Sequence, residues 1–343
     1  MIKVGIIGTG KTFGIADYHA VGLVHDGRAK IAAVYNSTKE SGLKWVARHG
    51  FNAKVCSSSQ ELLDIVDAVC ICTPNAYHYQ YAKEAIENSK DILIEKPLAL
   101  TTEQCKELAL LANGYPKVNM IGFVNRYAKA VQKARSIVQE RLGKVFTVTA
   151  WYGGKRLSDP CLPIEWRMIK SQAGTGALGD FGSHLIDLAY FIADQRYSEI
   201  SCITSTNIPY RAGEKIENDD SAMFIAKSNN GIGSFTVSRT GLDDIMILIS
   251  GEGGLIQVSL RKPTSVVFWE KSIDGGYTGK IENYSFPEHM ALDSWFDSQM
   301  TAFLDAVERK SLDYPDIQQG LYVQEVLEAA EISSDSHKEV SVK

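Results

Sequence analysis

The stretch Ile92-Leu93-Ile94-Glu95-Lys96-Pro97 places an acid, an amine and a proline directly after a short apolar run. A similar run at 68–72 ends in Thr73-Pro74-Asn75. Short apolar runs bounded by turn residues are typical of buried strands in a parallel sheet. Ligands bind beyond the carboxyl ends of such strands, so we expect Lys96 at a ligand site. A lysine there can polarise a carbonyl group or share a proton.

The first part of the chain alternates short apolar runs with amphipathic stretches, which predicts βαβ units around a parallel sheet. We expect strands at 3–7, 30–35, 68–72, 91–94 and 118–122, with helices at 76–87 and 102–112 among the connections. This pattern predicts an α/β fold that begins with a dinucleotide-binding Rossmann domain over residues 1–122.

The pattern changes after Gly122, where a predicted helix at 128–142 stops at Gly143 and a β-rich region follows. Few helices interrupt this region, so its large open sheet should be mainly antiparallel. We predict a second α/β domain over 123–343, whose C-terminal helix can pack back on the first domain. Its expected strands are 145–152, 200–207, 221–227, 232–238, 245–250, 255–260 and 265–269, and its last helices are 294–309 and 317–333.

The composition is that of an ordinary globular protein, with 343 residues, 22% charged and 45% hydrophobic. The net charge is −5 and no long basic cluster is present, so we expect no nucleic-acid partner. No run of apolar residues is long enough to span a bilayer. A strand begins at the N-terminus, so we expect no signal peptide and a cytoplasmic protein. The six cysteines lack metal-ligand spacing, and we predict no metal site.

The glycine turn Gly5-Ile-Ile-Gly8-Thr-Gly10-Lys-Thr-Phe13-Gly14 allows three interpretations. Glycines that let the backbone approach a pyrophosphate favour a dinucleotide turn, although Phe13 stands where a small residue is usual. Residues 5–12 also match the letters of a mononucleotide P-loop, but Ile6 and Ile7 continue the strand past Gly5. The third interpretation is a glycine-rich turn that only packs against its neighbours. The rest of the domain favours the dinucleotide-binding turn.

The second strand ends at Asn36, where an acidic residue would hold the ribose 2′-hydroxyl of NAD and repel a 2′-phosphate. Asn36 lacks that charge, and Ser37, Thr38 and Lys39 can donate to a phosphate. The segment therefore favours NADP(H), with NAD(H) possible. An ordinary polar turn is the alternative.

A second concentrated signal runs from Gly174 through Asp180 to His184. Glycines give way to a predicted helix, and residues four apart share one helix face, so Asp180 and His184 should be neighbours in its first turn. An aspartate beside a histidine can fix its tautomer and stabilise the imidazolium. A cap plus a surface histidine is the alternative. Asp187 is expected to support the helix.

Other polar residues near the expected site leave two interpretations open. His78 either faces the cofactor or is a satisfied structural histidine. Arg126 and Arg167 either bind substrate or a cofactor phosphate, or pair with a carboxylate. The expected pocket wall mixes aromatic and cationic side chains, which suits a sugar or an anionic product: Tyr152, Lys155, Arg156, Trp166 and Arg167.

Together these segments resemble the Gfo/Idh/MocA oxidoreductase family. The matching pieces are Val4–Gly10, Cys72-Thr73-Pro74-Asn75-x-x-His78, Glu95-Lys96-Pro97-Leu98 and Gly179-Asp180-x-Gly182-x-His184-x-x-Asp187, with further likeness at Asp219-Asp220-Ser221 and around Ser333. The resemblance implies NAD(P)-dependent oxidation or reduction at a carbinol carbon of a sugar, polyol or related molecule. It also implies that the domain 123–343 binds the substrate and serves in oligomerisation, with a homodimer or homotetramer formed through its sheet.

The resemblance implies roles for three residues: His184 as general acid/base, Lys96 polarising the substrate oxygen, and Asp180 orienting that pair. Relatives that use NAD for glycoside hydrolysis, or that bind dinucleotide only as regulators, are the alternatives. The predicted substrate contacts are Lys96, Arg126, Tyr152, Trp166, Asp180 and His184. The predicted cofactor contacts are Gly8, Thr9, Gly10, Thr12, Phe13, Asn36, Ser37, Thr38, Lys39, Thr73, Pro74, Asn75, His78, Glu95, Lys96 and Arg167.

Overall fold

The computed structural model describes the chain except for residues 11–13, 242, 261–262, 273, 275–276 and 287–291. Its contacts divide the chain into two compact units, residues 1–124 with 292–324 and residues 125–291 with 325–343. The segment 292–324 thus groups with the first unit. The functional domains 1–122 and 123–343 stay a prediction.

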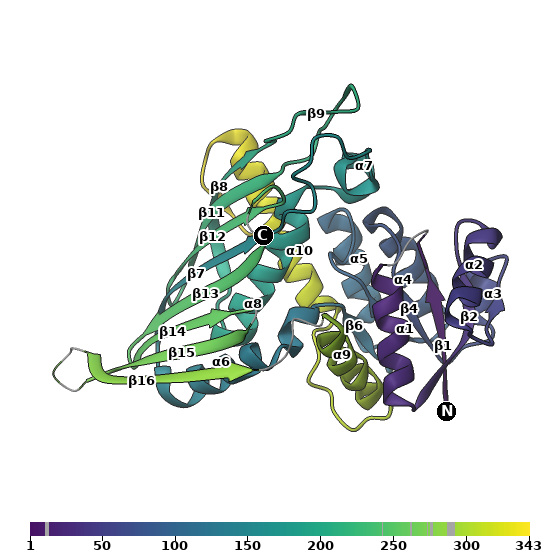
Figure 1. The fold of residues 1–343 in the computed structure, drawn as a ribbon, viewed down its shortest axis with the longest axis horizontal. Coiled ribbons are helices and arrows are strands. Elements are labelled where there is room, and N and C mark those ends of the chain that lie inside the picture. Colours follow the sequence, from purple (N-terminus) through teal and green to yellow (C-terminus); the bar gives the residue numbers. More distant parts are fainter. Residues whose placement is uncertain (11–13, 242, 261–262, 273, 275–276, 287–291) are drawn as a thin grey trace. The chain divides into compact units, whose positions relative to one another are not determined.

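The first unit is built on the predicted parallel sheet, which is confirmed (Figure 1). Its strand order is β3-β2-β1-β4-β5-β6, and the direction of winding reverses between β1 and β4. A reversal of this kind opens a crevice at the carboxyl ends of the strands. The strands are β1 (Ile2–Ile7), β2 (Ala29–Tyr35), β3 (Lys54–Val55), β4 (Ala68–Ile71), β5 (Asp91–Ile94) and β6 (Asn119–Ile121).

Side-chain caps start several helices of this unit, because the first amides of a helix have no partner within it. Thr38 Oγ1 accepts from Ser41 N, Ser58 Oγ from Glu61 N and Thr101 Oγ1 from Gln104 N. The helices are α1 (Ile15–Asp26), α2 (Lys39–His49), α3 (Ser59–Leu63), α4 (His78–Glu87), α5 (Thr102–Ala112) and α9 (Leu292–Val307), with short turns at Asn75–Tyr77 and Val124–Tyr127.

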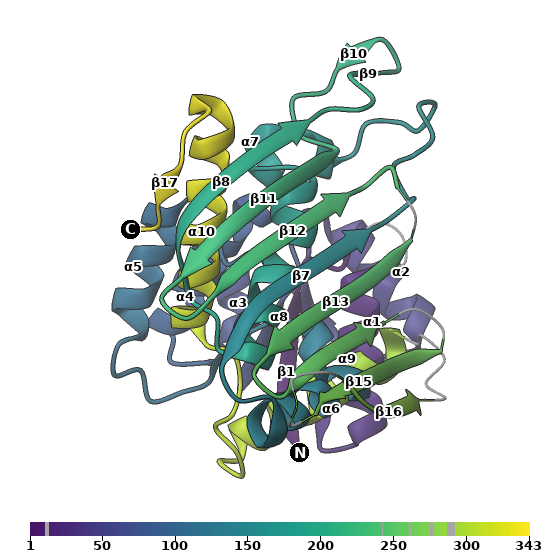
Figure 2. The same ribbon diagram turned by 90° about the vertical axis from the view of Figure 1, so that its left-hand side faces the viewer.

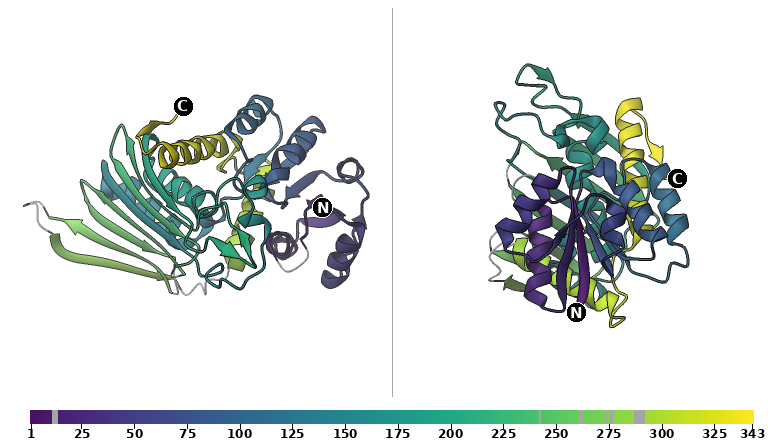
Figure 3. Two further views of the ribbon diagram at one scale, coloured as in Figure 1. Left: turned by 90° about the horizontal axis from the view of Figure 1, so that it is seen from above. Right: turned by 90° about the vertical axis from the view of Figure 1, so that its right-hand side faces the viewer.

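The second unit holds a nine-stranded sheet in the order β16-β15-β14-β13-β7-β12-β11-β8-β17. Among its described strands only the pair β7–β12 is parallel, so the predicted mainly antiparallel sheet is confirmed. Figure 2 shows these strands side by side, and Figure 3 shows how they twist. They are β7 (Val145–Gly153), β8 (Tyr197–Ser205), β11 (Ser221–Ser228), β12 (Ile232–Ser238), β13 (Asp244–Gly251), β14 (Gly254–Ser259), β15 (Thr264–Lys271), β16 (Tyr277–Phe286) and β17 (Val340–Ser341).

Helices cover one face of this sheet, with α8 against β7 and α6 against β14 to β16. The predicted helix 128–142 changes to a wider π turn after α6 and ends at Gly143, whose φ is 67°. The hairpin β9 (Tyr210–Arg211) and β10 (Glu214–Lys215) stands apart from the sheet. The helices are α6 (Lys129–Ile137), α7 (Lys170–Ala173), α8 (Ser183–Ala193) and, from Glu325 on, α10 (Ile317–Ser336), with turns at Val138–Leu142, Trp166–Met168 and Leu178–Gly182.

Within the described part of the chain, no helix combines the length and apolar character that a bilayer crossing requires. The same residues contain no group of three or more His, Cys, Asp or Glu side chains able to hold a metal ion. The cytoplasmic location stays a prediction.

Candidate functional site

The glycine turn leaves β1 in a conformation that only glycine adopts easily. Gly8 has φ +89° and Gly10 has φ +69°, both in the left-handed region. A Cβ atom on Gly8 would lie 2.7 Å from the backbone nitrogen of Thr73, so the loops after β1 and β4 approach too closely for any side chain. Two strand-end loops that meet backbone to backbone form the cradle a dinucleotide pyrophosphate requires.

The residues on either side of the glycine turn argue against the P-loop interpretation. Gly5 lies inside β1, which runs on to Ile7, so the strand does not end where a P-loop would begin. Predicted contacts Thr12 and Phe13 lie outside the described residues. Gly14 precedes α1, and its amide donates to Asp17 Oδ2 at 2.7 Å.

Asn36 directly follows β2, at the same carboxyl edge of the sheet. Its Nδ2 donates to Thr9 Oγ1 at 2.8 Å, and its Oδ1 accepts from Ser37 N at 2.9 Å. Ser37, Thr38 and Lys39 are exposed. The amide therefore fixes the turn beside the glycines, while three side chains with donor groups face solvent.

The segment Glu95–Pro97 follows β5, and a buried carboxylate holds it in place. Glu95 is only 6% exposed, its Oε1 lies 2.7 Å from His19 Nε2, and its Oε2 accepts from the backbone amide of Lys96 at 3.3 Å. A Cβ on Gly122 would come within 2.8 Å of Oε1, so the loop after β6 also fits closely around this group. Glu95 thereby ties α1 to the backbone that carries Lys96.

His78 lies between two of these loops. Its Nδ1 is 2.8 Å from Pro97 O and its Nε2 is 2.8 Å from Thr73 O, with the ring 1% exposed. A neutral ring donates through one of these nitrogens. Burial lowers the pKa of His78, although both carbonyls oppose that shift. These contacts support the structural interpretation of His78.

In the second unit, a π turn at Leu178–Gly182 carries Asp180, and α8 begins only at Ser183. The single helical turn expected for Asp180 and His184 is therefore replaced by a wider turn followed by a helix. Asp219 holds its entry: Oδ1 accepts from Gly176 N at 2.6 Å and Oδ2 from Leu178 N at 2.8 Å. Burial raises the pKa of Asp219, against those amides and the Arg239 charge.

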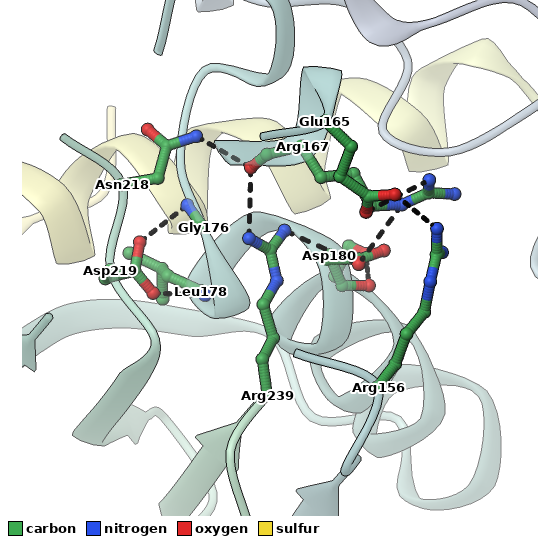
Figure 4. A network of polar contacts seen from close by, with 10 residues as sticks. Arg156, Glu165, Arg167, Gly176, Leu178, Asp180, Asn218, Asp219 and Arg239 are labelled. Carbon is green, nitrogen blue, oxygen red and sulfur yellow. Dashed lines mark hydrogen bonds and ion pairs between the residues drawn. The ribbon is translucent and has the colours of Figure 1, made fainter. Parts of the chain in front are cut away.

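Asp180 lies in a network of guanidinium groups (Figure 4). Its Oδ2 is 3.7 Å from Arg167 Nε and 3.5 Å from Arg239 Nη2. Arg167 also stacks over the Trp166 ring at 4.3 Å and lies 3.8 Å from Glu165. Asp180 thus lies between two positively charged guanidinium groups.

His184 lies at the start of α8 and is 6% exposed. The Tyr152 ring is 5.9 Å from it and stacks on Phe181 at 4.2 Å with an angle of 2° between the planes. Burial raises the pKa of Tyr152, and the charges of Asp180 and Asp243 add to the shift. The phenol therefore stays protonated across the physiological range and offers a neutral, flat wall.

Arg126 forms a buried pair with Asp187, the second of the two interpretations left open for it. Nε donates to Oδ2 at 2.8 Å and Nη2 to Oδ1 at 2.5 Å, with both side chains nearly inaccessible. Burial opposes the charge of Arg126, but the carboxylate of Asp187 raises its pKa overall. Asp187 supports α8 through this pair. The predicted contact of Arg126 with substrate stays a prediction.

Several residues of the site were not singled out from the sequence. His19, Arg239 and Phe181 gave no local signal, because their partners Glu95, Asp180 and Tyr152 lie far away in the chain. Glu165 pairs with the nearby Arg156 but belongs to no motif. Asp219 appeared only as part of a matching motif. The glycines at 174–182 are the local signal from which a carboxylate bound to the amides of this turn, that of Asp219, could have been predicted.

The fold and the loops around the sheet edge define a dinucleotide-binding protein of the Rossmann class. Residues 2–123 match the model of the oxidoreductase family with an NAD-binding Rossmann fold, and residues 131–257 match the GFO/IDH/MocA C-terminal domain. The chain belongs to the Gfo/Idh/MocA oxidoreductase family.

Individual relatives are sugar dehydrogenases. The chain is 32% identical over 56% of its length to levoglucosan dehydrogenase of Pseudarthrobacter phenanthrenivorans, covering 54% of that protein. It is 27% identical over 68% of its length to glucose-6-phosphate 3-dehydrogenase of Bacillus subtilis, covering 66% of that protein. The alignments thus span less than two thirds of both curated relatives. A solved levoglucosan dehydrogenase with NADH and levoglucosan is 25% identical, with 99% of both chains covered and a TM-score of 0.90.

Proposed function

We propose that this protein is an NAD(P)-dependent dehydrogenase or reductase that acts on a CH–OH group of a sugar, polyol or related small molecule. The observation that carries the proposal is the carboxyl edge of the first sheet. There the glycine turn, the Thr73 loop and the Lys96 segment lie at the ends of β1, β4 and β5. These three strands are adjacent in the sheet, and the direction of winding reverses between β1 and β4. The sugar substrates and NADH named for the relatives support the same class of reaction.

The bound nicotinamide would supply the acceptor or donor for a hydride. In the oxidative direction, His184 accepts the hydroxyl proton of the substrate while Lys96 stabilises the charge that develops on its oxygen. Asp180, which Arg167 and Arg239 hold in place, orients Lys96 and His184. The Tyr152–Phe181 stack offers an apolar surface to a sugar ring.

Removal of either proton-handling group tests these roles. Lys96→Ala and His184→Ala should each lower turnover by about 10²–10⁴-fold while dinucleotide still binds. Lys83→Ala, at an exposed lysine paired with Glu107, is the matched control and should keep full turnover. Near-native turnover in either variant would refute that residue's role. Release of a free leaving group without net change of NAD(P)H would point to the hydrolase alternative.

Gly8→Ala tests the cofactor cradle separately from the chemistry. The new Cβ would overlap the Thr73 backbone, so we expect dinucleotide affinity to fall at least about tenfold, equivalent to about 1.4 kcal/mol. Gly27→Ala is the control, since Gly27 also has a positive φ but no atom within 4 Å of its Cβ position. Equal affinity in the two variants would remove Gly8 from the binding site.

For the cofactor we propose a preference for NADP(H) over NAD(H), supported by the uncharged Asn36 and the exposed donors of Ser37, Thr38 and Lys39. Titration with NADPH and NADH, followed by quenching of tryptophan fluorescence, tests it. Asn36→Asp should weaken NADPH binding and favour NADH. Tighter NADH binding by the unchanged protein would overturn the preference and leave the family assignment intact.

We also propose that copies of the chain associate through the uncovered face of the nine-stranded sheet, as a homodimer or homotetramer. On β11, Ala222, Phe224 and Ala226 are buried, whereas Met223 and Ile225 on the opposite face are 63% and 61% exposed. Ile203 of β8 pairs directly with Met223 and is 72% exposed. An apolar patch of this kind marks an interaction surface. Ile225→Lys should reduce the mass seen by light scattering, whereas Leu43→Lys in the first unit should not.

A further inference from the structure

Arg239 follows β12 and is one of the few buried cations of the second unit, with 3% of the residue exposed. Its Nη1 donates to the backbone oxygen of Arg167 at 3.0 Å, and its Nη2 lies 3.5 Å from Asp180 Oδ2 (Figure 4). Its own backbone amide donates to Asp220 O at 2.8 Å, which fixes the main chain from which the side chain extends. One side chain thus bridges the turn at 166–168 and the turn at 178–182.

The burial of a permanent charge is costly unless anions compensate it. Here the compensation comes from Asp180, and from Asp219, whose pKa the Arg239 charge acts to lower. The carbonyl of Arg167 accepts a second hydrogen bond, from Asn218 Nδ2 at 2.9 Å. Two donors therefore hold one backbone oxygen, and the position of the Trp166–Met168 turn depends on both.

Asp180 contacts a second guanidinium, but the two arginines differ. The side chain of Arg167 is 28% exposed and lies at 3.7–3.8 Å from its carboxylates, whereas that of Arg239 is 4% exposed. Burial, with the nearby Arg156 and Arg239 charges, lowers the pKa of Arg167 despite Asp180 and Glu165. The nearby carboxylates therefore do not fully offset the burial of the Arg167 charge, and an anionic ligand would stabilise it. Arg239 remains paired with Asp180.

We infer that Arg239 is a positioning residue that holds the Asp180 carboxylate and the Arg167 backbone together, and so leaves the Arg167 guanidinium available to a ligand. The inference rests on the proposed dehydrogenase function. Arg239 itself need not touch substrate or cofactor, because it acts through Asp180 and through the backbone of Arg167.

A double-mutant cycle on turnover tests the inference. Arg239→Met, Asp180→Asn and the double variant are assayed with levoglucosan, D-glucose and glucose 6-phosphate, using the nucleotide that binds more tightly. Displacement of a catalytic group by about 1 Å can cost 10²-fold, so we expect Arg239→Met to lower kcat by about 10–10²-fold. Because the two residues act as one unit, the double variant should be no slower than the slower single variant.

Two further variants separate positioning from general stability. Arg239→Lys keeps the charge and should recover part of kcat. Arg141→Met is the matched control, since Arg141 also bridges two carboxylates, Glu282 at 2.8 Å and Glu270 at 3.0 Å, in the same unit. Its kcat should stay within about twofold of the unchanged protein, even if Tm falls as it does for Arg239→Met.

The outcomes are distinct. Additive losses in the cycle, or a kcat for Arg239→Met close to that of the unchanged protein with only a lower Tm, would overturn the positioning role and leave the dehydrogenase proposal standing. Absence of turnover by the unchanged protein, with bound dinucleotide and all three sugars, would overturn the proposed function and the inference with it.

Discussion

Two segments that carry proposed catalytic residues, Glu95–Pro97 in the first unit and the turn around Asp180 in the second, are held by different chemistry. Imidazole rings hold the first, through His19 on Glu95 and His78 between Pro97 and Thr73. Guanidinium groups hold the second, through Arg239 and Arg167 on Asp180. A guanidinium stays charged at every physiological pH, whereas burial lowers the pKa of the His78 ring. The support that His78 gives to the first unit should therefore depend on pH, and the support that the guanidinium groups give to the second unit should depend on it less.

The largest expected effect comes from breaking a buried guanidinium pair of the second unit. Arg126→Met leaves the Asp187 carboxylate buried without its bidentate partner, which should lower the free energy of unfolding by about 3–5 kcal/mol. Urea unfolding measures it. Lys227→Met, which breaks the exposed pair with Glu199, is the control and should cost about 1 kcal/mol or less. Equal losses would mean that burial does not set the strength of these pairs.

A smaller loss is expected for the imidazole support of the first unit. His19→Leu leaves Glu95 Oε1 buried without its partner and should cost about 1–3 kcal/mol by the same measurement. His19→Leu combined with Glu95→Leu should recover part of the stability, because no unpaired carboxylate then remains. A double variant less stable than the single one would show that Glu95 is satisfied without His19.

The smallest effect is a pH dependence. Burial lowers the pKa of His78 below its ordinary value of 6.5, so the folded protein binds fewer protons there than the unfolded chain. The free energy of unfolding should fall as the pH drops below about 6.5, until the folded pKa is passed. Each unit of pKa difference corresponds to about 1.4 kcal/mol. His78→Gln should remove this part of the slope between pH 7.5 and 5.

The guanidinium side of the comparison supplies the control for that experiment. Arg239→Met should lower stability at both pH 5 and pH 7.5, since the guanidinium does not titrate in this range. The loss should be somewhat smaller at pH 5, because the pKa of Asp219 rises further without the Arg239 charge. A slope that is unchanged in His78→Gln would mean that the pKa of His78 is the same in the folded protein and in the unfolded chain. The contrast between the units would then disappear.

The sequence by itself determined most of the longer elements and the two classes of sheet. Apolar runs bounded by turns located β1, β4 and β5, and the capping residues Ser58 and Thr101 stand where helices begin. Such signals are local, since they depend on side-chain periodicity and on the first amides of a helix. The edge strand β16 was missed, because its mostly polar sequence lacks the alternation of a half-buried strand.

Only the tertiary structure decided the partners of the polar groups. His19 and Glu95 are 76 positions apart, Arg126 and Asp187 are 61 apart, and Arg239 and Asp180 are 59 apart. No local pattern joins such residues, because their contact depends on how strands align and which loops follow them. The burial of a charge is costly unless a partner is close by, so these pairs form only when the chain has folded and brought distant segments together. The sequence determined which residues stand at the ends of the strands, and the packing decided which of them hold one another.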